Sequence, residues 1–122
     1  ALKANEIVWY APDQDFGPKH SVYAPFFGVE AATVTATSRI AKMNGSPILM
    51  LTHHRQPDGK YKLILHPCLD NFPSESDRLD AARVNEELEC GIRIVPGQYM
   101  WIHRRFKTHP EGKGYVYGKP RE

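Results

Sequence analysis

The sequence predicts a single domain of the α/β class, with α+β as the alternative: part of a mixed sheet with helices packed against it. Three observations lead to this prediction. An apolar, β-branched run lies near the start, a Pro-Asp-Gly turn separates two further apolar runs, and a later stretch repeats its apolar residues every four positions. With 122 residues, 41% of them hydrophobic, the chain has the size of one domain, or part of one, with its own core.

The first predicted element is a strand over residues 7–11. This run is apolar, β-branched and aromatic, and it ends at a Pro-Asp pair, as a buried strand does when it enters a loop. A second apolar run covers residues 22–27. Pro25 restricts it to an edge strand or an extended loop, because proline has no amide hydrogen to donate. Since the first strand begins so close to residue 1, we expect the chain to be cut from a larger domain.

A helix and a hairpin follow. Residues 31–43 are rich in alanine and end at an Asn-Gly pair, which is a good helix stop. Residues 47–52 and 61–65 read as two strands joined by a Pro-Asp-Gly turn over residues 57–60. The continuous apolar run in the first of these strands predicts that both of its faces are covered.

The last predicted element is a long amphipathic helix that packs on the sheet. It starts at Ser74 or Ser76, ends near Val95, and is stopped by a Pro-Gly pair. Residues 98–102 are aromatic and apolar, so we expect them to form a short buried turn or strand that anchors the end of the chain. The predicted domain covers residues 1–108, and the Pro-, Gly- and charge-rich residues 109–122 form a flexible tail.

Composition narrows the function classes. The formal net charge of +2 is too small to indicate a nucleic-acid partner. Cys68 and Cys90 match no zinc or redox spacing, so we expect two reduced thiols rather than a disulfide. No apolar run approaches the roughly 20 residues of a membrane span, and no signal peptide is recognisable. Any membrane contact is therefore expected to be peripheral or made by another segment. Without a nucleotide-binding or nucleophile motif, we expect neither a cofactor nor a metal.

Asp13 and Asp15 are the first candidates for a functional role. They lie just past the carboxyl end of the first predicted strand, the edge at which ligands collect in open α/β sheets. Two carboxylates one residue apart could hold a metal, a base or an arginine. The alternative is that both are turn residues that bond their own backbone.

Phe26 and Phe27 belong to an aromatic loop that could line an acyl channel, with core packing as the alternative. His53 and Asp58 form the one His-x4-Asp match, the spacing of a general-base dyad. Such a match arises readily by chance in a chain with six histidines and 14 acidic residues. Asp58 is also explained by the hairpin turn, so we expect no catalytic role for this pair.

A basic cluster closes the predicted domain. His103, Arg104 and Arg105 are followed by another cation at position 107, and six of the 16 Lys and Arg residues fall in the last twenty positions. Adjacent guanidinium groups bind phosphate bidentately, and Arg55 at the end of the first hairpin strand could join them. The alternative is a solvated basic tail, against which stands the aromatic anchor that precedes the cluster.

Together these segments resemble a known family. Residues 9–17 (WYAPDQDFG) are similar to the Asp-Gln-Asp block of the lipid A late acyltransferases, and residues 23–28 with 31–33 are similar to the next block. Arg55 and the Pro-Asp-Gly turn resemble the family's Arg and turn. Residues 96–107 (PGQYMWIHRRFK) resemble its C-terminal signature. The matches run in order along nearly the whole chain.

The resemblance implies the C-terminal half of an acyltransferase α/β domain at the cytoplasmic face of the bacterial inner membrane. It implies transfer of a fatty acyl chain from acyl carrier protein to a hydroxyl of a Kdo-bearing lipid A precursor. In that family the His-x4-Asp/Glu dyad lies upstream of the Asp-Gln-Asp block, so it would fall before residue 1 and this chain alone would be inactive. Asp13 and Asp15 would then support catalysis. Arg55, His103, Arg104, Arg105, Phe26 and Phe27 would bind substrate.

The sequence is compatible with two other functions. One is a non-catalytic domain that binds anionic lipid or acyl carrier protein, since both fit a basic face. The other is an α/β domain in which Asp13 and Asp15 only make turns. Half of a sheet would expose an edge and an apolar face, so we also expect the piece to form homo-oligomers or aggregate.

Overall fold

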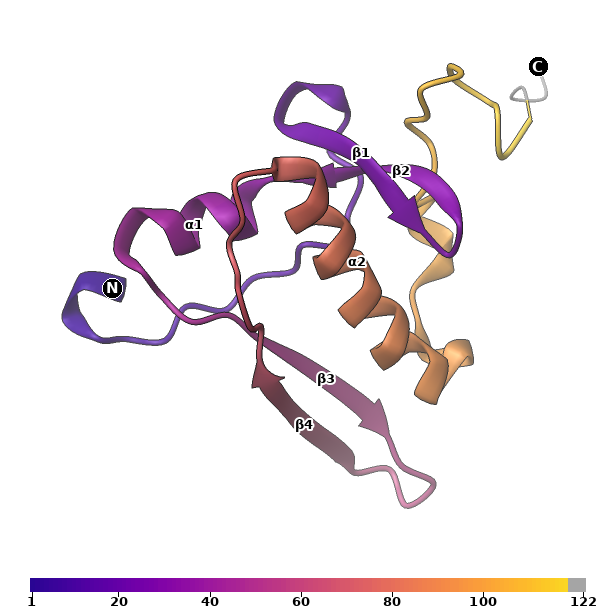
Figure 1. The fold of residues 1–122 in the computed structure, drawn as a ribbon. Coiled ribbons are helices and arrows are strands. Elements are labelled where there is room, and N and C mark those ends of the chain that lie inside the picture. The colour runs from indigo at the N-terminus through magenta and orange to yellow at the C-terminus, as the bar shows by residue number, and fades with distance from the viewer. Residues whose placement is uncertain (119–122) are drawn as a thin grey trace.

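The computed structural model describes residues 1–118 and contains two β-hairpins and two α-helices (Figure 1). The elements are β1 (Ser21–Phe26), β2 (Val29–Val34), α1 (Ala36–Asn44), β3 (Leu49–Arg55), β4 (Tyr61–Cys68) and α2 (Asp77–Ile94). The mixed α/β class is confirmed. The strands form two separate two-stranded antiparallel sheets, β1–β2 and β3–β4, rather than one sheet.

The β1–β2 hairpin and α2 form the core. Ala24, Phe26, Ala31 and Ala32 are at most 1% exposed, and α2 packs on this hairpin with Ala81 and Val84. Small alanine side chains let the helix approach the strands closely. The predicted edge strand over residues 22–27 is confirmed, with Pro25 on a ladder that has only one partner.

The predicted helix over residues 31–43 begins later than expected. Residues 29–34 are a strand, and the helix spans Ala36–Asn44, with Gly45 as its C-cap in the left-handed conformation, φ 65°. The reason is the run Thr33, Val34 and Thr35, because β-branched side chains fit a strand better than a helix. Pairing with β1 therefore overrides the alanine content of this segment.

The β3–β4 hairpin is confirmed, but the expectation that both faces of its first strand are covered is wrong. The hairpin projects away from the rest of the molecule (Figure 1). One face meets α2, where Thr52 touches Gly91. The opposite face is open, with Leu63 and Leu65 of β4 67% and 71% exposed.

The predicted strand over residues 7–11 is absent from the structure. This segment is irregular, and Ile7 is 97% exposed and Trp9 68% exposed. An isolated extended segment has no ladder to satisfy its backbone, and no described strand lies beside it. A side-chain hydrogen bond between Tyr10 and Thr37 connects it to the fold.

The long helix is confirmed as α2, with the Ser76 hydroxyl capping the amide of Leu79 at 3.3 Å. The aromatic anchor forms two short 3-10 turns, η3 (Pro96–Gln98) and η4 (Trp101–His103). The turn was expected, but its burial was not found: Ile102 is 87% exposed.

The two remaining expectations concern a membrane span and the C-terminal tail. No helix within residues 1–118 is long and apolar enough to cross a membrane. The flexible tail over residues 109–122 stays a prediction. Within its described part the His109 ring stacks on Tyr115 at 4.1 Å, and residues 119–122 lie outside the described residues.

Candidate functional site

The loop that carries Asp13 and Asp15 lies against the C-terminal loop, although some ninety residues separate them in sequence. Asp15 is 4% exposed. One carboxylate oxygen accepts from the Gly17 amide at 2.8 Å, as in the turn that the sequence allowed, and the other accepts from the Thr108 amide at 2.7 Å. Asp15 therefore joins the two loops as well as making a turn. We call the loop over residues 13–17 together with residues 99–108 the junction.

Arg105 holds the junction to the core. Its side chain is 1% exposed, and its guanidinium donates to the Ala32 carbonyl at 2.7 Å and the Thr33 hydroxyl at 3.0 Å. It also lies over the Phe26 ring, 5.1 Å from the centroid. Burial lowers the pKa of this guanidinium, while nearby acidic groups, among them Asp15, oppose the change.

Asn85 of α2 completes this buried network and was missed from the sequence. It is 0% exposed, donates to the Pro25 carbonyl at 2.8 Å and the Thr33 hydroxyl at 3.0 Å, and accepts from Arg105 at 3.5 Å. A signal was present: Asn85 stands four residues after Ala81, on the buried face of the helix. A polar side chain at such a position needs buried partners.

Arg104 takes the opposite direction from its neighbour. Its backbone is left-handed, φ 54°, where η4 ends, and its side chain is exposed and lies over the Tyr117 ring at 4.9 Å. The predicted clamp of two adjacent guanidinium groups is therefore not formed in this structure. Arg105 is used within the protein, and Arg104 is the member of the pair that a ligand can reach.

His103 braces the two loops of the junction. One ring nitrogen, Nε2, lies 3.2 Å from the Asp13 carbonyl and 3.5 Å from the Tyr99 hydroxyl, and the other contacts the Met100 carbonyl. Burial raises the pKa of Tyr99 above its ordinary range, and the Asp13 charge adds to this, so its phenol stays protonated and can donate. The Asp13 side chain itself is half-buried.

The two phenylalanines of the predicted acyl channel differ in position. Phe26 is 0% exposed and packs against Phe106 with ring centroids 5.7 Å apart, so it belongs to the core. Phe27 is half-buried in the hairpin turn, with a left-handed φ of 48°, and its amide donates to Glu89 at 2.7 Å. Its ring neighbours Trp101, with centroids 5.8 Å apart, and the guanidinium of Arg93 lies over it at 4.9 Å from the centroid.

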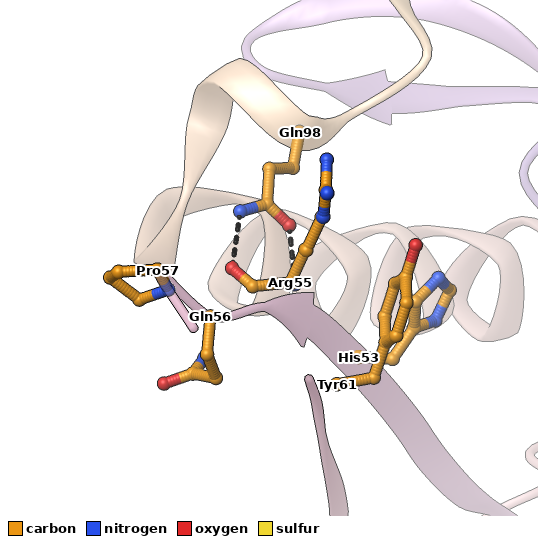
Figure 2. A pocket seen from close by; sticks show the side chains of 6 residues that line it. All are labelled: His53, Arg55, Gln56, Pro57, Tyr61 and Gln98. Carbon is orange, nitrogen blue, oxygen red and sulfur yellow. Dashed lines mark hydrogen bonds between the residues drawn. The ribbon is translucent and has the colours of Figure 1, made fainter. Parts of the chain in front are cut away.

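Arg55 occupies a separate pocket at the free end of the β3–β4 hairpin (Figure 2). The pocket has a volume of about 780 Å³. It is lined by His53, Arg55, Gln56, Pro57, Tyr61 and Gln98. The Gln98 carboxamide makes two hydrogen bonds to the Arg55 backbone, accepting from its amide at 2.8 Å and donating to its carbonyl at 2.9 Å. We call this the hairpin-tip pocket.

The His53–Asp58 pair is not a catalytic dyad in this geometry. Asp58 accepts from the Lys60 amide at 3.1 Å and pairs with the Lys60 ammonium at 3.5 Å, so the hairpin turn uses it. The His53 ring instead neighbours Tyr61, with centroids 6.3 Å apart. Within residues 1–118 no group of three His, Cys, Asp or Glu side chains is arranged to hold a metal ion.

Comparison with known proteins points to one family. The family model for bacterial lipid A biosynthesis acyltransferases matches residues 1–108. A lipid A biosynthesis lauroyltransferase of Escherichia coli K12 is 49% identical over 114 residues, which is 92% of this chain and 37% of that protein. A palmitoleoyltransferase of the same strain is 43% identical over 96% of this chain and 39% of its own length. A myristoyltransferase of that strain is 35% identical over 86% of this chain and 33% of its own length. The chain thus spans less than two-fifths of each of these relatives.

Proposed function

Because this chain belongs to the bacterial lipid A biosynthesis acyltransferase family, we propose that it works as part of an enzyme that moves a fatty acyl chain from acyl carrier protein to a hydroxyl of a Kdo-bearing lipid A precursor. The observation that carries the proposal is the match of residues 1–108, which includes the junction and the hairpin-tip pocket. Acyl transfer in lipid A biosynthesis is the activity that the names of the relatives share.

The proposed reaction is a direct acyl transfer. The acceptor hydroxyl oxygen bonds to the thioester carbonyl carbon as the carbon–sulfur bond breaks, and the hydroxyl proton passes through a general base to the released thiol. Neither His53 nor His103 suits the role of base, because His53 has no carboxylate partner and His103 braces two loops. We assign that role to a His-x4-Asp/Glu segment of the whole enzyme, as the family resemblance implies.

This chain would then contribute binding and positioning. Arg104 and Arg55 present exposed cations, which suit the phosphates and carboxylates of the acceptor. Asp13 lies beside Tyr99 and His103, where a half-buried carboxylate can orient a polar group of the substrate. We place this machinery at the cytoplasmic face of the inner membrane, in peripheral contact with the lipid.

The test uses the intact protein that carries this chain. Acyl transfer from lauroyl acyl carrier protein to the lipid A precursor is followed by mass spectrometry for wild type, Asp13→Asn and Arg104→Met. We expect each variant to lose at least about tenfold in rate, the worth of one charge-assisted interaction. Arg39→Met, an exposed arginine on α1, is the matched control and should keep full activity.

The outcomes separate the alternatives. If folded wild-type protein transfers no acyl chain but binds acyl carrier protein, the domain is a non-catalytic binding module. If transfer is normal in both variants, Asp13 and Arg104 are structural residues and the functional assignment of the junction is wrong.

A further inference from the structure

The geometry of the hairpin-tip pocket points to a binding site for a phosphate monoester on a sugar, with Arg55 contacting the phosphate and Gln98 positioning Arg55. The choice of a sugar phosphate rests on the proposed function. The site itself rests on the pocket, its charges and the fixed strand end, none of which requires that the enzyme be active.

Arg55 has a free guanidinium and a fixed backbone. Its side chain is exposed, and it enters no ion pair with any residue of the described chain. The two hydrogen bonds from Gln98 hold its amide and carbonyl, and the side chain rises beside Gln98 over the pocket (Figure 2). Because the backbone of Arg55 is already fixed, only its side-chain torsions lose freedom when a ligand binds, and the planar guanidinium fork matches two phosphate oxygens.

The other lining groups complete a polar site without a competing carboxylate. His53 stands two residues before Arg55, on the same face of β3, and Tyr61 is the register partner of Arg55 on β4. Their rings can donate hydrogen bonds and stack on a sugar face. The nearest acidic residue in sequence, Asp58, is outside the lining and is held by Lys60. The pocket therefore favours an anion.

The dimensions suit a small phosphorylated ring. The volume of about 780 Å³ lies in the range of small-molecule sites, roughly 300–1,000 Å³. The pocket lies on an open surface, so a ring carried by a larger molecule could enter while the remainder stays outside. An unsubstituted phosphate ion would use Arg55 but leave His53 and Tyr61 without a partner.

The test is a binding titration of the full chain by calorimetry, with N-acetylglucosamine 1-phosphate, N-acetylglucosamine and inorganic phosphate as probes. We expect the sugar phosphate to bind at least about tenfold more tightly than either of the other two. Arg55→Met should weaken it by at least about tenfold, and Arg55→Lys by less, because an ammonium keeps the charge but loses the fork. Arg39→Met is the control and should bind as wild type does.

Gln98→Met tests the positioning role. It should weaken sugar-phosphate binding severalfold and shift the NMR resonance of the Arg55 amide, while Arg39→Met, which changes an exposed residue of α1 outside the pocket lining, should leave that resonance in place. Thermal unfolding of each variant checks that the fold is kept. Equal binding by inorganic phosphate would overturn the sugar assignment, and unchanged binding by Arg55→Met would overturn the site. Normal binding by an intact enzyme that transfers no acyl chain would instead count against the proposed function alone.

Discussion

The junction and the β3–β4 hairpin both carry predicted substrate-binding arginines, yet they are built in opposite ways. At the junction, Arg105 is 1% exposed and its two terminal nitrogens donate to backbone and side-chain acceptors of the core, while its buried Nε has no partner among the described residues. At the hairpin, Arg55 is exposed, and a single glutamine holds its backbone while the guanidinium stays free.

This difference shows that the sequence alone does not distinguish a buried, structural arginine from an exposed arginine that a ligand can reach. Arg104 and Arg105 are adjacent, and the left-handed turn at Arg104 sends one outward and the other into the core. Under the proposed function, the arginines that bind substrate are those whose guanidinium groups are exposed, Arg55 and Arg104. Variants that remove one arginine at a time can confirm or break this distinction.

The largest effect is expected for Arg105→Met. Three buried acceptors would lose a donor, each worth about 1–3 kcal/mol, and relief of the cost of burying the charge offsets part of this, so we expect a loss of about 3 kcal/mol in the free energy of unfolding. Arg104→Met should change it by less than about 1 kcal/mol, the worth of an exposed cation–π contact. Chemical denaturation measures both. Equal losses for the two variants would contradict the comparison.

A middle-sized effect is expected where the hairpin meets α2. In Gly91→Ala the new methyl group would clash with the Thr52 side chain, because it would lie closer than van der Waals contact allows. We expect this clash to cost about 1–3 kcal/mol in stability. Thr52→Ser removes the clashing methyl group but keeps the hydroxyl that contacts His66 at 2.8 Å. Combined with it, Gly91→Ala should become neutral or stabilising, since alanine favours a helix by about 1 kcal/mol over glycine. A double-mutant cycle by thermal unfolding measures this rescue, and additive losses would show that α2 and the hairpin are not in contact.

The smallest effect concerns pH and Tyr99. Its pKa is raised in the folded protein, so this group's contribution to stability is complete below the ordinary tyrosine value of 10.0 and falls as pH rises above it. Between pH 10 and 11 we expect wild type to lose up to about 1 kcal/mol more than Tyr99→Phe. Unfolding curves at pH 8, 10 and 11 test this. Parallel losses for the two proteins would mean that the phenol is not desolvated at the junction.

The sequence predicts correctly those elements whose ends or register depend on nearby residues. Ser76 and the Pro-Gly pair bound α2, and the Pro-Asp-Gly turn sets the β3–β4 register. Elements that depend on distant partners were predicted less well. Residues 7–11 have strand composition but no described strand to pair with, and Thr33 and Val34 pair with β1 instead of joining the helix.

The same limit applies to the candidate site. The sequence identified Asp15 and the basic cluster, but not that Asp15 bonds the Thr108 amide or that Asn85 bonds Arg105. Such pairs are joined only by tertiary packing. The sequence places Gln98 in an aromatic anchor, because no nearby residue indicates that its carboxamide bonds the end of a strand 43 residues earlier.

That carboxamide has a mechanical consequence. Gln98 begins the short stretch that leads to Tyr99 and His103, so the tip of the projecting hairpin is coupled to the loop that holds Asp13. The tip of the hairpin can therefore move only if the two Gln98–Arg55 hydrogen bonds break or if the loop that carries Asp13 moves with it.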